Sequence, residues 1–262
     1  MSKFRRQLMM ASVPLPPPPP PPFYTTLGYV NDGLVAMWDG IYNANTETHD
    51  SSATTWVEMV SNTPSNVFTD QVVNNDSLTI GSTLILLSPT VNFSAEDIIP
   101  NRPYTVEMVA EEVTKAADST AASGVYVRGL HQLGYFRHQN NNAWGPDVFR
   151  ISNIYVAMSI DGLTYNQIYP KANKSFVVSN WSSVNTTNAR DKVAVYYNGT
   201  LRSAHRYTFS SGSAPTENGV IYIGGSSTGK FKYYNIRIYN RALTAEEIAA
   251  NYAVDAQRFI IT

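Results

Sequence analysis

The stretch Asn235-Ile-Arg-Ile-Tyr-Asn-Arg-Ala-Leu-Thr-Ala-Glu-Glu-Ile-Ala-Ala-Asn-Tyr252 combines two kinds of sequence pattern. Its first residues alternate between apolar and polar side chains, which predicts a β-strand. Thr244 and Glu247 then form a capping box, in which each side chain satisfies a backbone N–H at the start of a helix. Ile248 and Tyr252 lie four residues apart on one face of that helix. The stretch therefore predicts a final strand and a short helix, which we expect to pack on the edge of the sandwich.

The same alternation recurs upstream in short runs that are separated by turn residues. Further strands are expected over residues 33–38, 104–111, 154–160, 193–197 and 220–238. Asp161-Gly162 and Asn198-Gly199 each stand between two apolar runs, and these dipeptides predict two-residue β-hairpins. Many short strands with regular turn signals indicate an all-β chain that folds as a two-sheet antiparallel jelly-roll sandwich.

Four segments resemble LamG-like jelly rolls of the concanavalin A-like lectin/glucanase superfamily. Residues 235–252 are similar to that family's closing strand and capped helix, and Gly33-Leu-Val-Ala-Met-Trp-Asp39 to its opening strand. Val195-Tyr-Tyr-Asn-Gly-Thr-Leu201 resembles one of its hairpins, and Ile221-Tyr-Ile-Gly-Gly225 the strand that follows. The resemblance spans about residues 30–255. It implies the fold and says little about function, because one fold carries many functions.

Calcium is the only ion that the sequence leaves open. Asp39, Asn43 and Asp50 could supply oxygen ligands near one rim of the sandwich, although a role as ordinary polar turn residues is the favoured interpretation. Many members of the resembled family carry an acidic residue before the Ile-Arg-Ile-Tyr segment, whereas this chain has Tyr234 and Asn235 there. A calcium site that relied on that carboxylate would lack it, so we expect no cofactor.

The composition of the 262-residue chain excludes several classes of protein. It has no cysteine, which rules out disulfides, thiolate metal sites and cysteine nucleophiles. Lys and Arg number 19 against 20 Asp and Glu, so no basic excess indicates nucleic-acid binding. No apolar stretch reaches the length of a transmembrane helix, and we expect no membrane insertion.

An unbroken proline run from Pro16 to Pro22 separates a basic N-terminal segment from the strands. Proline lacks the backbone N–H that a helix interior or central strand needs, so the run should form a polyproline II rod of roughly 22 Å. It is either a stiff spacer or a docking ligand for an aromatic groove. We predict an arm at 1–22 and a sandwich domain at 23–262. The residues expected to anchor the arm are Lys3, Phe4, Arg5, Arg6, Pro16 and Pro22.

The beginning of the chain, Met1-Ser-Lys-Phe-Arg-Arg-Gln-Leu-Met-Met10, has a second likeness. It resembles the start of LamG-domain proteins encoded by phages and prophages of gut Bacteroidetes. That resemblance implies a virion component such as a head fibre, joined through its arm to other virion proteins. Arms that converge on one axis would hold several copies together, so we expect a homo-oligomer, with a trimer as the simplest form.

No catalytic activity is expected. Hydrolases of the resembled superfamily place two Glu on one strand with an Asp between them. Glu107 and Glu111 have a similar spacing, but Val109 stands between them and can neither orient nor ionise a partner. We interpret both glutamates as solvated carboxylates on a half-exposed strand.

Glycan contact is the second functional hypothesis, because aromatic rings stack on sugar rings while amides bond hydroxyl groups. The candidate contacts are Tyr135, His138, Asn140, Trp144 and Trp181. The leading expectation is a non-enzymatic virion protein, and contact between its sandwich and a host surface glycan is compatible with that role. The alternatives are a carbohydrate-binding lectin of bacterial or prophage origin on the bacterial cell surface and, third, a glycan hydrolase.

Overall fold

The computed structural model describes residues 20–44, 47–49, 52–66, 72–80, 85–87, 103–114, 122–127, 131–137, 149–150, 175–181, 193–202, 221–224 and 230–261. Its helices are the 3₁₀ turn η1 (Phe23–Thr26) and α3 (Ala245–Phe259). Its strands are β1 (Leu34–Asp39), β2 (Tyr42–Ala44), β3 (Glu47–Thr48), β4 (Thr55–Glu58), β5 (Thr63–Asn66), β6 (Val72–Val73), β7 (Leu78–Ile80), β8 (Ile85–Leu87), β9 (Tyr104–Thr114), β10 (Ala122–Val127), β11 (His131–Arg137), β12 (Phe149–Arg150), β13 (Ser175–Trp181), β14 (Val193–Tyr197), β15 (Thr200–Arg202), β16 (Ile221–Gly224) and β17 (Lys230–Tyr239).

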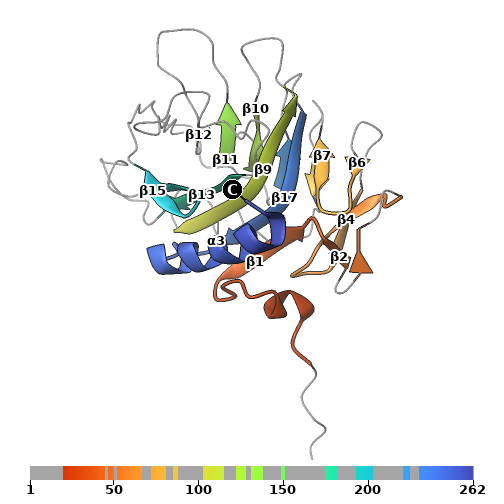
Figure 1. Cartoon of the computed structure of the whole chain (residues 1–262), viewed down its shortest axis with the longest axis horizontal. Coiled ribbons are helices and arrows are strands. Elements are labelled where there is room, and N and C mark those ends of the chain that lie inside the picture. Colours follow the sequence, from red (N-terminus) through yellow and green to blue (C-terminus); the bar gives the residue numbers. More distant parts are fainter. Residues whose placement is uncertain are drawn as a thin grey trace, which may run out of the picture.

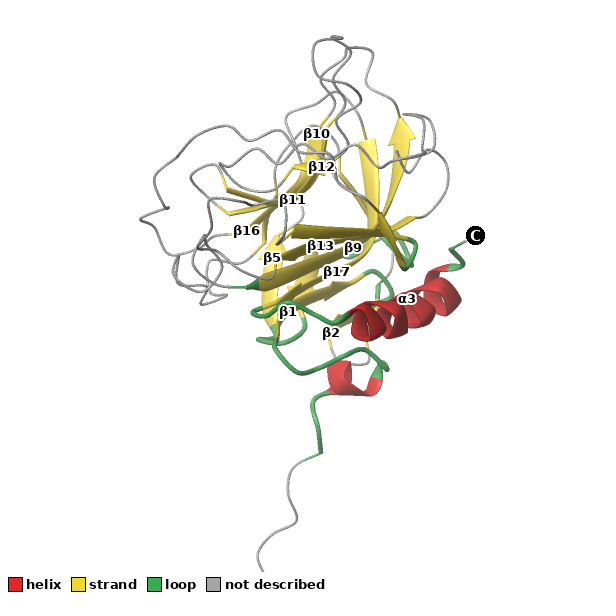
Figure 2. Cartoon of the chain, turned by 90° about the vertical axis from the view of Figure 1, so that its left-hand side faces the viewer, coloured by secondary structure: helices red, strands yellow, loops and turns green. Residues whose placement is uncertain are grey.

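The strands form two antiparallel layers (Figures 1 and 2). The eight-stranded sheet has the order β15-β14-β13-β9-β17-β7-β6, with β1 also paired to β17. The five-stranded sheet has the order β12-β11-β10-β16-β8. Two further strand pairs, β2–β3 and β4–β5, lie outside these sheets. The all-β antiparallel fold with one C-terminal helix, as expected from the sequence, is confirmed.

Strand β17 organises the larger sheet, because it pairs with β9 on one side and with both β1 and β7 on the other. Alternation gives the sheet two distinct faces. On the inner face, Val106 pairs with Ile238 and Met108 with Ile236, and all four side chains are buried. On the outer face, Glu107 pairs with Arg237. The register therefore brings opposite charges together on the side that faces α3.

We expected this helix on the edge of the sandwich, whereas α3 lies across the outer face of the larger sheet. Figure 2 shows α3 lying against the layer that contains β1, β9 and β17. Its apolar side chains Ile248 and Phe259 join one buried cluster with Val109 of β9 and Tyr239 of β17. The sheet is thus buried on both sides where the helix crosses it.

The N-terminal end of α3 has the cap that its sequence predicts, whereas its C-terminal end has an unusual residue at the cap. Thr244 accepts a hydrogen bond from the backbone N–H of Glu247, whose side chain accepts one in return from the backbone of Thr244. The predicted capping box is confirmed. At the other end Ile260 takes a left-handed conformation with φ 54°, and Ile261 donates to the carbonyl of Ala256. Glycine is the usual residue at this position, so a β-branched side chain there is strained.

The hairpin predicted at Asn198-Gly199 is present between β14 and β15. Both turn residues have positive φ, 46° and 72°, as a type I′ turn requires. A Cβ on Gly199 would come within 2.6 Å of the Tyr252 ring on α3, so glycine also permits this close approach. The hairpin predicted at Asp161-Gly162 lies outside the described residues. No helix in the described part of the chain is long and apolar enough to cross a membrane.

Candidate functional site

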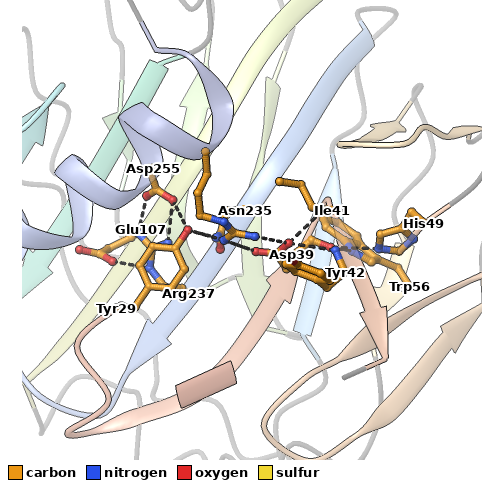
Figure 3. Close-up of polar contacts among 11 residues, drawn as sticks. Tyr29, Asp39, Ile41, Tyr42, His49, Trp56, Glu107, Asn235, Arg237 and Asp255 are labelled. Atoms are coloured by element: carbon orange, nitrogen blue, oxygen red, sulfur yellow. Dashed lines mark hydrogen bonds and ion pairs between the residues drawn. The ribbon is translucent and has the colours of Figure 1, made fainter. Parts of the chain in front are cut away.

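Three parts of the chain converge on a buried polar cluster beneath α3. Arg237 of β17 is 1 % exposed and lies between Glu107 of β9 and Asp255 of α3 (Figure 3). Its Nε donates to Glu107 Oε2 at 2.7 Å, and its two terminal nitrogens donate to the Asp255 carboxylate at 3.0 and 2.6 Å. One guanidinium therefore joins the sheet to the helix.

The Tyr29 hydroxyl connects this ion pair to the segment that precedes β1. It donates to Asp255 Oδ1 at 2.6 Å and accepts from Arg258 Nη1 at 2.6 Å and from Asn235 Nδ2 at 3.0 Å. The Arg237 guanidinium lies 4.0 Å from the centre of the Tyr29 ring, a cation–π distance. A single side chain thus touches both arginines of the cluster.

A second ion pair, between Asp39 of β1 and Arg258 of α3, continues the cluster. Its two hydrogen bonds measure 2.6 and 2.9 Å. Asp39 Oδ1 also accepts from the backbone N–H groups of Ile41 and Tyr42, which fixes the turn after β1. The Asp39 carbonyl accepts from the Trp56 indole at 2.7 Å (Figure 3). Asp39 is therefore a structural anchor for β1, the next turn and α3 together.

Asn251 closes the cluster over the outer face. Its Nδ2 donates to Glu107 Oε2 at 2.9 Å and to the Tyr239 hydroxyl at 3.0 Å, and its Oδ1 accepts from the backbone N–H of Val30. The side chain is fully buried. The segment that leads from the proline run into β1 is consequently bonded to the helix by both backbone and side chain.

Burial sets the electrostatics of the cluster. Burial raises the pKa of Glu107, and the neighbouring Arg237 lowers it only in part. Burial also raises the pKa of the Tyr29 hydroxyl, and the nearby Asp255 carboxylate adds to the effect, so the hydroxyl stays protonated and can donate. For Arg237, burial opposes the charge, but Asp255 and Glu107 outweigh it and the pKa is raised. The guanidinium therefore remains charged in place.

The cluster holds segments of the chain together. Its carboxylates Glu107, Asp255 and Asp39 are completely buried. Breaking one partner of such a pair costs about 3–5 kcal/mol, because the other charge is left buried and unpaired. The arrangement fixes the position at which the chain leaves the sandwich toward residue 20.

The expectation of a solvated Glu107 is wrong. The alternating pattern correctly placed Glu107 and Glu111 on one face, but α3 covers that face, and Glu107 bonds to Arg237 and Asn251. Glu111 is half-buried and accepts a hydrogen bond from the Tyr234 hydroxyl. Glu107 is sealed beneath a helix, where a sugar cannot reach it.

The predicted glycan contacts fall on separate parts of the molecule or outside its described residues. Tyr135 lies in β11, opposite Gly124 of β10 and Arg150 of β12. Trp181 ends β13 in the other sheet, opposite Tyr104. His138, Asn140 and Trp144 lie outside the described residues. The glycan site therefore stays a prediction.

Most of the arm also lies outside the described residues, including Lys3, Phe4, Arg5, Arg6 and Pro16. Pro22 is described, is exposed and precedes η1, and its carbonyl accepts from the backbone N–H and the hydroxyl of Thr25. The boundary at residues 22 and 23 stays a prediction, since the contacts of the arm itself are not described.

The calcium candidates are engaged in other bonds. Both Asp39 oxygens bond to Arg258, and Asn43 Oδ1 accepts from the backbone N–H of Val57. Asp50 lies outside the described residues. Within the described ranges no three His, Asp or Glu side chains are grouped so that they could hold a metal ion. The Asn235 amide donates to Asp39. An acidic residue at position 235 would instead place a second negative charge beside Asp39.

The sequence analysis missed the residues that build the cluster. Asn251, Asp255 and Arg258 recur at intervals of four and three residues, so they form a polar stripe on a helix whose neighbouring apolar positions are buried. Such a stripe indicates polar partners beneath the helix. Tyr29 has no comparable signal, because it lies in an irregular segment before β1.

Comparisons with known proteins place this architecture. Residues 88–249 match the family described as the Concanavalin A-like lectin/glucanases superfamily. Among solved structures, Trypanosoma rangeli sialidase in complex with sialic acid is similar with a TM-score of 0.56 and 15 % identity, over 88 % of this chain and 34 % of that chain. The receptor binding domain of botulinum neurotoxin C/D mosaic serotype is similar with a TM-score of 0.51 and 12 % identity, over 86 % and 52 %.

This chain thus spans about a third of the sialidase and half of the toxin domain. At these identities the likeness concerns the fold alone. Comparison with curated protein sequences finds no match. The family match covers more than half of the chain and agrees with the two antiparallel sheets and the helix that closes them. The chain belongs to the concanavalin A-like lectin/glucanase superfamily.

Proposed function

We propose that this protein is a non-enzymatic, carbohydrate-binding component of a virion, such as a head fibre. In this proposal the sandwich contacts a glycan on the host surface, and the N-terminal arm joins the protein to other virion proteins. The superfamily includes lectins, and the similar structures include a sialidase with bound sialic acid and a toxin's receptor-binding domain. These relatives support glycan recognition as the role of the sandwich.

The burial of Glu107 is the observation that favours binding over hydrolysis. Glycoside hydrolysis needs two carboxyl groups that flank the scissile bond within reach of the sugar. Glu107 is 0 % exposed and bonded to Arg237 and Asn251. The pair formed by Glu107 and Glu111 therefore has one member that a substrate cannot approach.

A glycan array with the full chain tests the binding part of the proposal. Native protein should bind a defined set of glycans, and Trp144→Ala should lose most of that signal because a ring that stacks on a sugar is removed. Leu201→Ala, at an exposed position on β15, is the matched control and should bind normally. Absence of binding, or binding that Trp144→Ala leaves intact, contradicts the proposed site.

Deletion of residues 1–22 tests the virion part. The truncated protein should keep the native circular dichroism spectrum, because the cluster around Tyr29 remains, yet it should fail to enter particles during assembly. Normal incorporation of the truncated protein would refute the anchoring role of the arm.

The second candidate is a bacterial or prophage-encoded lectin at the cell surface, which the same family membership supports. It shares the glycan-array result and differs in location. Mass spectrometry of purified particles separates the two, since a virion component co-purifies in fixed stoichiometry. A hydrolase would require glycan turnover that is lost in Glu111→Gln. We expect no turnover by the native protein or by this variant.

A further inference from the structure

Half-buried aromatic side chains surround the point where the described chain begins. Phe23 and Tyr24 belong to η1, and Tyr42 belongs to β2. The Phe23 and Tyr42 rings meet edge to face with centroids 4.8 Å apart. All three side chains pack against the buried apolar cluster that includes Ile248 and Phe259, while keeping part of their surface exposed. We call these three residues the aromatic collar.

The collar is held rigidly. The backbone N–H of Tyr42 donates to Asp39 Oδ1, and Asp39 is itself paired with Arg258. The backbone N–H groups of Thr25 and Leu27 donate to the carbonyls of Pro22 and Tyr24, which fixes η1. The Arg258 guanidinium lies 5.6 Å from the centre of the Tyr42 ring. A partner would therefore meet preformed rings, with little ordering left to do on binding.

Rigid aromatic surfaces are the usual receptors for polyproline II segments, because proline rings pack on aromatic faces and the extended backbone is already ordered. This chain supplies such a segment itself, with seven consecutive prolines that end at Pro22. Pro22 has φ −56° and ψ 140°, which is polyproline II geometry. The ligand chemistry and the receptor chemistry thus adjoin in one sequence.

A proline run in polyproline II geometry is too stiff to fold back on itself. It advances about 3.1 Å per residue and stays straight over several residues, so this geometry favours a collar on another chain as its receptor. A neighbouring chain that ran beside the first could place its own prolines against these rings.

We propose that the aromatic collar of Phe23, Tyr24 and Tyr42 is the docking surface for the proline run of a second copy of this chain. The exchange is reciprocal, because each copy offers both a collar and a run. The inference rests on the proposed virion role together with the homo-oligomer expected from the sequence, and it names the surfaces that hold that oligomer together. It leaves residues 1–13 beyond the junction, where they remain available to another virion protein.

Sedimentation of the full chain provides the first test. The native protein should be larger than one copy at micromolar concentration. Tyr42→Ser should raise the dissociation constant of the oligomer about tenfold, as loss of a central aromatic contact does in other interfaces. Pro17→Ser with Pro19→Ser should weaken association similarly without touching the folded domain. Leu201→Ser, on the distant edge strand β15, should leave the mass and the dissociation constant of the oligomer unchanged.

Cysteine crosslinking identifies the surfaces that meet between two copies. The sequence has no cysteine, so each introduced cysteine is the only thiol in its chain. Two chains with different tags are mixed, one carrying Pro18→Cys and the other Thr26→Cys, an exposed position on η1. Oxidation should produce a disulfide between the two tags. The control partner, Thr200→Cys, is exposed on β15 and should give no crosslink above background.

The outcomes separate the inference from the rest of the proposed function. A monomeric native chain would overturn both the docking surface and the homo-oligomer. An oligomer that resists Tyr42→Ser and the proline substitutions, and that forms no crosslink between Pro18→Cys and Thr26→Cys, would overturn the docking surface alone. Glycan binding and particle incorporation are measured independently of either result.

Discussion

Arg237 on β17 lies opposite Glu107 in the strand register and bonds at the same time to Asp255 on α3. One fully buried cation therefore neutralises carboxylates from two different layers. Replacement by Met removes the cation and leaves both carboxylates buried. We expect Arg237→Met to lower the free energy of unfolding by about 3–5 kcal/mol, measured by urea denaturation. A loss below 1 kcal/mol would contradict the structural role.

Arg241 supplies the matched control for Arg237. It pairs with Glu247 and Asp32, but its side chain is 27 % exposed, and the carboxylate of Asp32 is 86 % exposed. Water screens such pairs, and exposed ion pairs contribute about 0–1 kcal/mol. Arg241→Met should therefore lower the free energy of unfolding far less than Arg237→Met.

Tyr29→Phe removes one oxygen and keeps the ring. Arg258 and Asn235 would lose the acceptor that the hydroxyl provides, and Asp255 would lose a donor. Because these groups stay buried, we expect a loss of about 2–3 kcal/mol in the free energy of unfolding. Tyr24→Phe is the control at a partly exposed ring and should cost under about 0.5 kcal/mol. Equal effects from both variants would argue against a structural role for the Tyr29 hydroxyl.

Asn235→Asp changes one atom of a buried side chain. The amide donates to Tyr29 and Asp39, whereas a carboxylate cannot donate and would stand beside the charge of Asp39. At pH 7 we expect a loss of about 2–4 kcal/mol, with partial recovery in acid as the new carboxyl group takes up a proton. Asn240→Asp, at an exposed position, should be nearly neutral. Thermal unfolding at several pH values measures both.

The raised pKa of Glu107 predicts a specific pH dependence. The folded protein binds a proton at Glu107 more tightly than the unfolded chain does, because burial disfavours the carboxylate. Stability from this group is therefore greatest below the unfolded pKa and falls as the pH rises through the folded pKa. Relative to Glu107→Gln, the native protein should lose stability as the pH rises from about 4.5 toward neutral. Parallel stability curves for the two proteins would contradict this.

Ile260→Gly should stabilise the protein. Ile260 is 73 % exposed and its backbone is left-handed. The substitution therefore removes backbone strain and sacrifices little buried apolar surface. Glycine at this position should contribute about 0.5–1 kcal/mol of unfolding free energy despite its own flexibility. Ala253→Gly, in the exposed middle of α3, should instead cost about 1 kcal/mol. Urea denaturation of both variants checks the opposite signs.

Local patterns predicted the elements that local chemistry controls. The type I′ hairpin at Asn198-Gly199 and the cap formed by Thr244 and Glu247 depend on residues within a few positions of each other. Alternation likewise placed β1 and β9 correctly. The superfamily could be recognised because these elements occur together in the order that the fold requires.

The polar cluster could not be predicted in the same way, because its partners are far apart in sequence. Glu107 and Arg237 are separated by 130 positions, and Tyr29 and Asp255 by 226. The alternation of β9 correctly put Glu107 on the face away from the inner core. That pattern cannot show that α3 covers this face, so a glutamate in an apparently half-exposed strand was assigned to solvent.

The attachment of the arm's base to α3 and β17 has a mechanical consequence. Tension on the arm would enter through Phe23, pass Tyr29 and act along β1, which is antiparallel to β17. The bonds of Tyr29 and Val30 to α3 would have to break before such a load could open the pairing of β1 with β17. The buried pairs of Arg237 and Arg258 would resist the same displacement. A pull on the chain at residue 20 would thus meet the contacts beneath α3 before it reached the sheet.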